Sequence, residues 1–150
     1  MGRDDTFGDI WNPKAHFFSY GGYITLNIAI IDDVQQDLDT LGRAAQNYYE
    51  DRQIMVQIQS FSSPAAFWKA YTPGKYDLIF LDIQMKMVDG LHAAERIRQM
   101  DETVGIIFLT TLTQYGLEGY KYHATNYIIK PMKYARLKSE MDKFVERSQK

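Results

Sequence analysis

Polar residues that could do chemistry end four separate apolar segments of this chain. Asp32 and Asp33 follow Leu26–Ile31, Asp82 follows Asp77–Leu81, Thr110 follows Val104–Leu109, and Lys130 follows Tyr127–Ile129. Packing of an apolar core does not explain a polar residue at these points. If the four segments are parallel strands of one sheet, their carboxyl ends bring three carboxylates, a hydroxyl and an amine into one region.

Such a set of groups favours magnesium-dependent phosphoryl chemistry. Three carboxylates in one region repel one another, so one of them takes up a proton unless a cation intervenes. Mg²⁺ prefers oxygen ligands and keeps several waters while it binds only a few carboxylates. Lys130 would then give a point charge, and Thr110 a hydrogen bond, to phosphoryl oxygens. A carboxylate such as Asp82 can itself be the nucleophile and form an aspartyl phosphate.

Each of these residues also has an ordinary structural explanation when it is taken alone. Asp32 or Asp33 could cap the helix that follows, and Asp82 could begin a turn. Thr110 could be a simple strand-end residue and Lys130 a solvated lysine. The recurrence of such residues at successive strand ends is what favours a site.

The elements that must position these residues alternate between strands and helices. The apolar segments, together with Ile54–Phe61, predict five strands. Helices are predicted between and after them, with these markers: Val34, Leu38, Leu41 and Ala45; a start at Ser63–Pro64; a turn at Asp89–Gly90 and then Leu91, Ala94 and Ile97; Gln114–Tyr122; and Leu137, Met141 and Phe144. This alternation predicts an α/β fold, a doubly wound five-stranded parallel sheet with helices on both faces.

Composition narrows the class of protein. The chain has 150 residues, a net charge of −2 and no cysteine, so bulk charge predicts no nucleic-acid or membrane partner and thiolate chemistry is excluded. No apolar run is long enough to span a bilayer, and the acidic N-terminus does not suit a secretory signal. We therefore expect a cytoplasmic protein. Residues 1–23 differ in composition and are expected to be a flexible leader or extension, or else a docked aromatic arm; residues 24–150 are expected to form one domain.

Five ordered motifs resemble the response-regulator receiver family of two-component systems. They are Ile30–Asp33, Phe80–Met85, Asp89–Gly90, Phe108–Thr110 and Ile129–Pro131, within residues 24–148. The resemblance implies a flavodoxin-like sheet with strand order 2-1-3-4-5. It also implies a phosphorelay receiver that takes a phosphoryl group from a partner histidine kinase and switches an output, assisting its own Mg²⁺-dependent transfer without being an enzyme.

The same resemblance implies roles for the matching positions. Asp82 is the expected phosphoacceptor, Asp33 the direct Mg²⁺ ligand, and Asp32 a residue that acts on the metal mainly through water. The backbone carbonyl of Gln84 would add a further metal ligand. Two more residues, Thr110 and Lys130, would contact the phosphoryl oxygens.

The resemblance further implies how a signal leaves the domain. Tyr127 would be the switch aromatic, whose ring turns inward when Thr110 moves toward the phosphate. The face built from the fourth helix, fifth strand and fifth helix would then change, and in this family it often mediates dimerisation. Here that face would include Tyr115, Tyr120, Lys121 and Tyr127. Similarity to receivers that precede LytTR-type DNA-binding domains implies a parent transcription regulator.

Two departures from the family pattern leave alternatives open. Lys86 stands where the family often has proline, and Thr111 where it usually has a smaller residue. A phosphate-independent pseudo-receiver, acting only as a protein-interaction module, is therefore the alternative function. A haloacid-dehalogenase-type enzyme is disfavoured, since it requires a second acid where this chain has Gln84. A nucleotide-binding domain is disfavoured because no Gly-rich loop follows the first strand.

Overall fold

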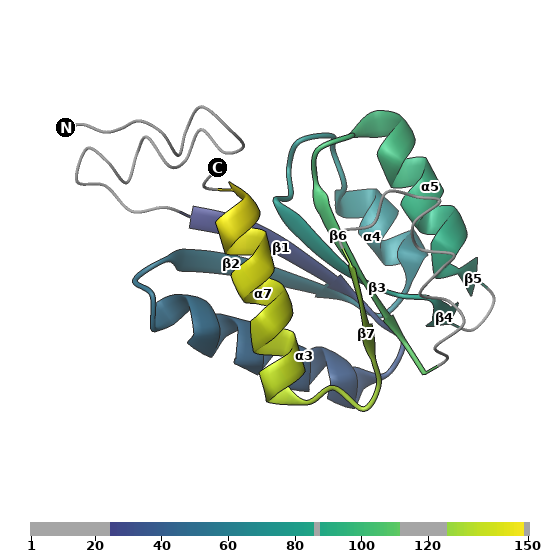
Figure 1. The fold of residues 1–150 in the computed structure, drawn as a ribbon. Helices are drawn as coiled ribbons and strands as arrows, with labels where there is room; N and C mark the ends of the chain where they lie inside the picture. Colours follow the sequence, from purple (N-terminus) through teal and green to yellow (C-terminus); the bar gives the residue numbers. More distant parts are fainter. Residues whose placement is uncertain (1–24, 86–87, 112–125, 149–150) are drawn as a thin grey trace.

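The computed structural model describes residues 25–85, 88–111 and 126–148. Within them, five parallel strands form one sheet: β1 (Thr25–Ile31), β2 (Met55–Phe61), β3 (Leu78–Asp82), β6 (Gly105–Thr110) and β7 (Asn126–Ile129). The strand order is β2-β1-β3-β6-β7, which confirms the predicted order 2-1-3-4-5 (Figure 1). The chain therefore reverses its direction of winding after β2, and the carboxyl ends of β1 and β3 become neighbours.

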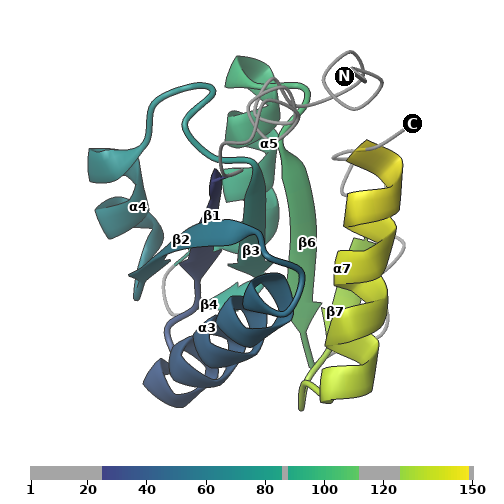
Figure 2. The same ribbon diagram turned by 90° about the vertical axis from the view of Figure 1, so that its left-hand side faces the viewer.

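Helices cover both faces of this sheet (Figures 1 and 2). The described helices are α3 (Gln35–Glu50), α4 (Pro64–Ala70), α5 (Gly90–Met100) and α7 (Tyr134–Ser148). One core cluster joins α3 and α7 to side chains such as Ile28 and Ile30 of β1. A second joins α4 and α5 to Ala29 and Ile31 of the same strand. Successive residues of a strand point to opposite faces, so β1 contributes to both cores.

The burial of each strand follows its place in the sheet. All described residues of β3 and β6 are buried, as expected for central strands that helices cover on both sides. The edge strand β2 instead alternates, with Val56 and Ile58 half-buried and Gln57 exposed. This alternation is expected of an edge strand that has one face on the core and the other in solvent.

The predicted helix starts are partly right. Ser63 caps α4, since its hydroxyl accepts a hydrogen bond from the Ala66 amide, and Pro64 is the first helical residue. Val34 was expected on the apolar face of the preceding helix, α3, but that is wrong. It is the N-cap residue of α3, it lies outside the helical repeat, and the residue is 44% exposed.

The turn predicted at Asp89–Gly90 is a helix start. A short hairpin of β4 (Gln84–Met85) and β5 (Val88–Asp89) precedes it. Asp89 then caps α5 by accepting a hydrogen bond from the Leu91 amide. Aspartate suits a turn and an N-cap for the same reason, because its carboxylate accepts from amides slightly further along the chain.

Some sequence predictions lie outside the described residues. They are the N-terminal extension 1–23, the helix over Gln114–Tyr122, and the side chains of Lys86, Tyr115, Tyr120 and Lys121. Among the helices that the structure describes, none has the length and apolar content needed to cross a membrane.

Candidate functional site

The carboxyl ends of the central strands bring the three predicted acids together. Asp32 and Asp33 follow β1, and Asp82 is the last residue of β3. One carboxylate oxygen from each lies within 4.8 Å of the others. Asp32 and Asp82 are buried and Asp33 is exposed, so the cluster opens to solvent on the Asp33 side.

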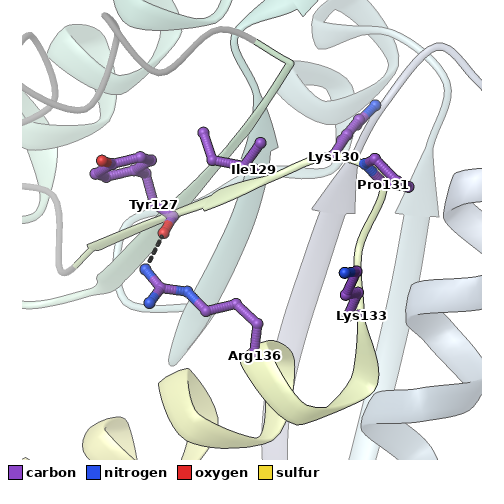
Figure 3. A pocket seen from close by; sticks show the side chains of 6 residues that line it. All are labelled: Tyr127, Ile129, Lys130, Pro131, Lys133 and Arg136. Atoms are coloured by element: carbon purple, nitrogen blue, oxygen red, sulfur yellow. Dashed lines mark hydrogen bonds between the residues drawn. The ribbon is translucent and has the colours of Figure 1, made fainter.

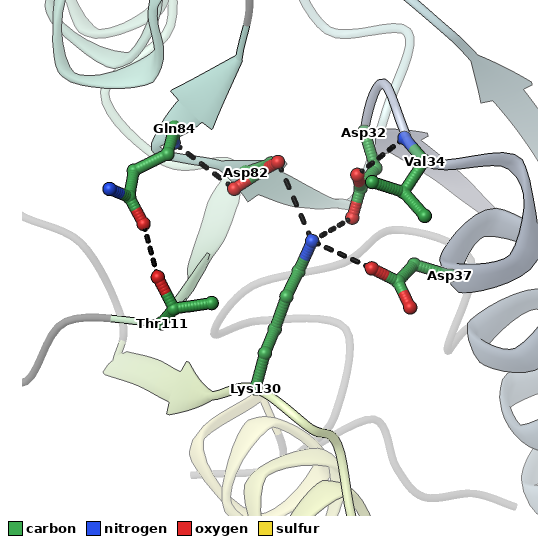
Figure 4. A network of polar contacts seen from close by, with 7 residues as sticks. All are labelled: Asp32, Val34, Asp37, Asp82, Gln84, Thr111 and Lys130. Atoms are coloured by element: carbon green, nitrogen blue, oxygen red, sulfur yellow. Dashed lines mark hydrogen bonds and ion pairs between the residues drawn. The ribbon is translucent and has the colours of Figure 1, made fainter.

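Lys130 reaches this cluster from the end of β7 (Figure 4). Its Nζ lies 2.7 Å from Asp32 Oδ2 and 3.5 Å from Asp82 Oδ2. The lysine side chain is only 12% exposed, so these ion pairs are largely screened from bulk water. The predicted juxtaposition of an amine with the strand-end acids is therefore present.

Asp82 is held in an environment that disfavours its negative charge. Burial raises the pKa of its carboxyl, the neighbouring Asp32 raises it further, and Lys130 partly offsets both, which brings the pKa to about 7. The Gln84 amide donates to Asp82 Oδ1 at 3.1 Å, which fixes the orientation of the carboxylate. A cation beside the three acids would add positive charge to that of Lys130, which alone does not balance them.

Asp32 also organises the chain that leaves β1. The Val34 amide donates to Asp32 Oδ1 at 2.9 Å, while Oδ2 faces Lys130. Asp32 thus stabilises the turn into α3, as one of its alternative explanations suggested, and lines the cluster with its other oxygen. The two explanations are compatible because a carboxylate can accept several hydrogen bonds at once.

Thr110 and Lys130 are connected through the backbone. Thr110 ends β6, pairs in register with Ile129 and is buried. The Lys130 amide donates to the Thr110 carbonyl at 2.7 Å. The end of β6 is therefore hydrogen-bonded to the backbone of the residue that carries the ammonium of the site.

Thr111 and Gln84 form a contact that sequence reasoning missed. The Thr111 hydroxyl donates to Gln84 Oε1 at 2.5 Å, and both side chains are exposed (Figure 4). This bond joins the loop after β3 to the end of β6, beside Asp82. Thr111 was singled out for its bulk, whereas the structure adds a polar link to the residue whose carbonyl was expected to face the metal.

Tyr127 lies on β7, three residues before Lys130. It is half-buried in β7, opposite Phe108 of β6, and packs against the core cluster of α4 and α5. Arg136 of α7 donates to its carbonyl oxygen at 2.9 Å. A cavity of about 520 Å³ lies there, with this lining (Figure 3): Tyr127, Ile129, Lys130, Pro131, Lys133 and Arg136.

Asp37 is a fourth acid at the site that sequence reasoning missed. It lies in the first turn of α3, and its Oδ2 is 2.8 Å from Lys130 Nζ. The signal that could have found it is its spacing, since a residue in the first turn of a helix lies close to the strand end that precedes that helix. The acid set around Lys130 is therefore Asp32, Asp37 and Asp82.

The donor set fits a divalent cation such as Mg²⁺. All side-chain donors of the Asp32, Asp33 and Asp82 cluster are carboxylate oxygens, as hard cations prefer. The exposed Asp33 leaves one side of the cluster open to water, which Mg²⁺ retains when it binds proteins. The raised pKa of Asp82 indicates negative charge that a cation would neutralise.

Comparison with known sequences identifies a family. The family described as "Response regulator receiver domain" matches residues 28–142. The transcriptional regulatory protein RprY of Bacteroides fragilis is 31% identical over 114 residues, 75% of this chain and 48% of RprY. The transcriptional regulatory protein LytR of Staphylococcus aureus is 35% identical over 69 residues, 46% of this chain and 28% of LytR. The chain spans less than half the length of these curated relatives.

Comparison with solved structures supports the same fold. The BeF3-activated receiver domain of DrrB has a TM-score of 0.69 at 22% identity, over 82% of this chain and 99% of DrrB's. A two-component response regulator from Clostridium difficile has a TM-score of 0.64 at 25% identity, over 81% and 97%. TrrA from Thermotoga maritima, solved with Mg²⁺ and BeF, has a TM-score of 0.66 at 24% identity, over 79% and 98%. These likenesses confirm the flavodoxin-like topology.

Proposed function

This chain belongs to the response regulator receiver family, and we propose that it accepts a phosphoryl group on Asp82 from a partner histidine kinase. The observation that carries the proposal is the placement of Asp82. It is a buried carboxylate at a strand end, with two further acids within 4.8 Å and the ammonium of Lys130 at 3.5 Å. Receivers are phosphoacceptors and not enzymes in the usual sense.

The metal in this proposal is Mg²⁺, held by Asp33, Asp82 and the Gln84 carbonyl, with Asp32 acting mainly through water. Bound there, Mg²⁺ would neutralise the charge of the acids and of the incoming phosphoryl oxygens. The cluster of acid oxygens supports this assignment, as does the Mg²⁺ complex of the related TrrA. The lowered electrostatic cost would let Asp82 react in its ionised form.

The chemical step transfers one phosphoryl group. An oxygen of ionised Asp82 attacks the phosphorus of the kinase's phosphohistidine, and a new P–O bond forms as the P–N bond breaks. The imidazole nitrogen leaves with the electron pair and takes a proton from solvent. Lys130 and Thr110 would stabilise the charge on the transferred oxygens. The protein would therefore promote the transfer by positioning the groups and by electrostatic stabilisation.

The output of the switch is proposed from the relatives. RprY and LytR are transcriptional regulators of which this chain matches less than half, so the parent protein would carry a DNA-binding output region. Tyr127 would sense the movement of Thr110 and pass it to the face of β7, where a second copy could bind. The domain itself would bind no nucleic acid, and its location in the cytoplasm stays a prediction.

Incubation with acetyl phosphate and Mg²⁺ tests the phosphoacceptor proposal. Intact-mass spectrometry is expected to detect one phosphoryl adduct per chain, and chelation of the metal with EDTA before the donor is added should prevent it. The same donor with Ca²⁺ in place of Mg²⁺ is a control for ion type, because Ca²⁺ also takes oxygen ligands but prefers more of them. Complete absence of an adduct with Mg²⁺ would instead favour the pseudo-receiver.

Thr111→Ala is expected to speed both formation and loss of the adduct severalfold. The side chain stands beside Asp82, and its hydroxyl ties down Gln84, so its removal opens the approach for donor and water. Stopped time courses read by mass would give the two rates. Thr111→Ser keeps the hydroxyl and lacks the methyl, so it separates the effect of side-chain bulk from that of the hydrogen bond to Gln84. Rates equal to the parent's in both variants would refute the predicted effect.

A further inference from the structure

Lys130 has more acid partners than its proposed role requires. An ammonium has three N–H donors, and three carboxylates surround this one. Its Nζ lies 2.7 Å from Asp32 Oδ2, 2.8 Å from Asp37 Oδ2 and 3.5 Å from Asp82 Oδ2 (Figure 4). The two short contacts hold the ammonium toward Asp32 and Asp37, so a phosphoryl oxygen on Asp82 that draws Lys130 closer would compete with one of them.

Asp37 is the partner that can give up its contact at the lowest cost. Asp32 is fully buried and its second oxygen already accepts from the Val34 amide, so loss of the ammonium would leave a buried charge with less compensation. The side chain of Asp37 is 30% exposed, so water can replace the ammonium. Its position in the first turn of α3 also stabilises its charge through the helix dipole when Lys130 leaves.

From this geometry we propose that Asp37 is a resting-state partner of Lys130 that competes with the phosphoryl group. In the unmodified protein Asp37 holds the ammonium away from Asp82, and uptake of a phosphoryl group exchanges the Asp37 contact for a phosphoryl contact. Asp37 is thus a positioning residue that sets how readily the site accepts an anion. The inference rests on the proposed function, because it concerns the same lysine.

Asp37 is distinct from the acids expected to hold the metal. The carboxylates that gather within 4.8 Å of one another are those of Asp32, Asp33 and Asp82. Asp37 is not in that group, and it is linked to the site by its ion pair with Lys130. Its removal should therefore alter anion uptake while it leaves Mg²⁺ affinity nearly unchanged, a split that a general structural defect would not produce.

Asp37→Asn tests the competition. The variant keeps the shape of the side chain and loses the charge, so Lys130 is released toward Asp82. Calorimetric titration of the full chain with beryllium fluoride, at saturating Mg²⁺, should show binding about three- to tenfold tighter than in the parent, the range expected for loss of one partly exposed charged contact. Asp37→Glu, which retains the charge, should bind with an affinity between the two.

Asp39→Asn is the matched control. Asp39 lies on the same helix and is exposed, and its carboxylate accepts from Gln35. The variant removes the same charge without touching Lys130, so its affinity for beryllium fluoride should stay within about twofold of the parent's, as for a screened surface charge. A gain as large as that of Asp37→Asn would reduce the effect to net charge and overturn the inference.

The outcomes separate the inference from the function on which it rests. Weaker or unchanged binding in Asp37→Asn, with normal binding in the parent, would overturn the competition and leave the proposed function standing. Weaker binding would make Asp37 a helper of Lys130 instead of its competitor. Failure of the parent to bind beryllium fluoride at all would overturn the proposed function, and the inference would fall with it.

Discussion

Asp82→Asn is expected to abolish the phosphoryl adduct and, without Mg²⁺, to make the folded protein more stable above about pH 7. The first effect follows because the amide oxygen of asparagine is too weak a nucleophile to form the acyl phosphate. The second follows because the pocket raises the pKa of Asp82 from 3.8 to about 7. Mass spectrometry with acetyl phosphate and chemical denaturation across a pH series measure the two effects.

The stability effect depends on the proton that Asp82 binds in the folded protein. Between about pH 4 and pH 7 the folded protein retains a proton on Asp82 that the unfolded chain has released. The free energy of unfolding of the parent therefore falls as pH rises through this window, and asparagine escapes that loss. We expect Asp82→Asn to be more stable by about 1–3 kcal/mol above this window, and to match the parent near its lower end.

Mg²⁺ should reduce this difference in stability between Asp82→Asn and the parent. A bound cation stabilises the parent, in which all three acids can be ionised, more than the variant with one fewer carboxylate. Asp39→Asn is again a suitable control, and it should retain the adduct. An adduct that survives in Asp82→Asn would place the phosphate on another residue, whereas an unstable variant would show that the carboxylate supports the fold in its charged form.

Much of the fold was predictable because apolar runs and polar strand ends coincide. Each central strand is a short apolar run that stops at an acid or a threonine, and this pattern alone indicates which ends of the sheet come together. Val34 shows the limit of helical spacing as a guide. It has the right interval from Leu38, yet the helix begins one residue later, and Val34 is exposed where the chain changes direction.

The part of the site that sequence could not supply consists of contacts between separate elements. Asp37 looks like an ordinary acid in a first helical turn, and only the position of β7 brings Lys130 to it. The bond from Thr111 to Gln84 joins the residue after β6 to the short strand β4, 27 residues away in the chain. Adjacent Tyr48 and Tyr49 of α3 are both buried, which a single apolar stripe along the helix does not predict. Tyr48 can be buried because its hydroxyl donates a hydrogen bond to Asp142 of α7.

Gly90→Ala is expected to cost about 2–4 kcal/mol of unfolding free energy, at the upper end of what an overpacked site produces. A Cβ at this position would lie 2.1 Å from the Asp82 carbonyl oxygen and 2.8 Å from the Ile83 Cα. Both are backbone atoms, so no side chain can rotate away to relieve the overlap. The Gly90 amide also donates to the Ile83 carbonyl at 2.9 Å, which holds the start of α5 against this strand end.

Gly42→Ala provides the matched control for this substitution. Gly42 lies within α3, and a Cβ there would meet nothing within 4 Å. The same change should therefore stabilise the protein, by up to about 1 kcal/mol, since alanine favours helix more than glycine does. Denaturation of both variants in parallel isolates the effect of close approach from that of helix propensity. Equal stability of Gly90→Ala and the parent would show that α5 can move away from β3 at little cost.

The same substitution should impair phosphorylation beyond its effect on folding. The overlap is with the carbonyl of Asp82 itself, so relief requires either that α5 moves or that the Asp82 backbone shifts. A displaced Asp82 would lose its alignment with the Gln84 amide and Lys130, which lie 3.1 Å and 3.5 Å from its carboxylate oxygens. Adduct formation measured where the variant is still fully folded should therefore fall severalfold, because phosphoryl transfer depends on positioning. A normal rate in folded Gly90→Ala would mean that α5, and not the phosphoacceptor, absorbs the strain.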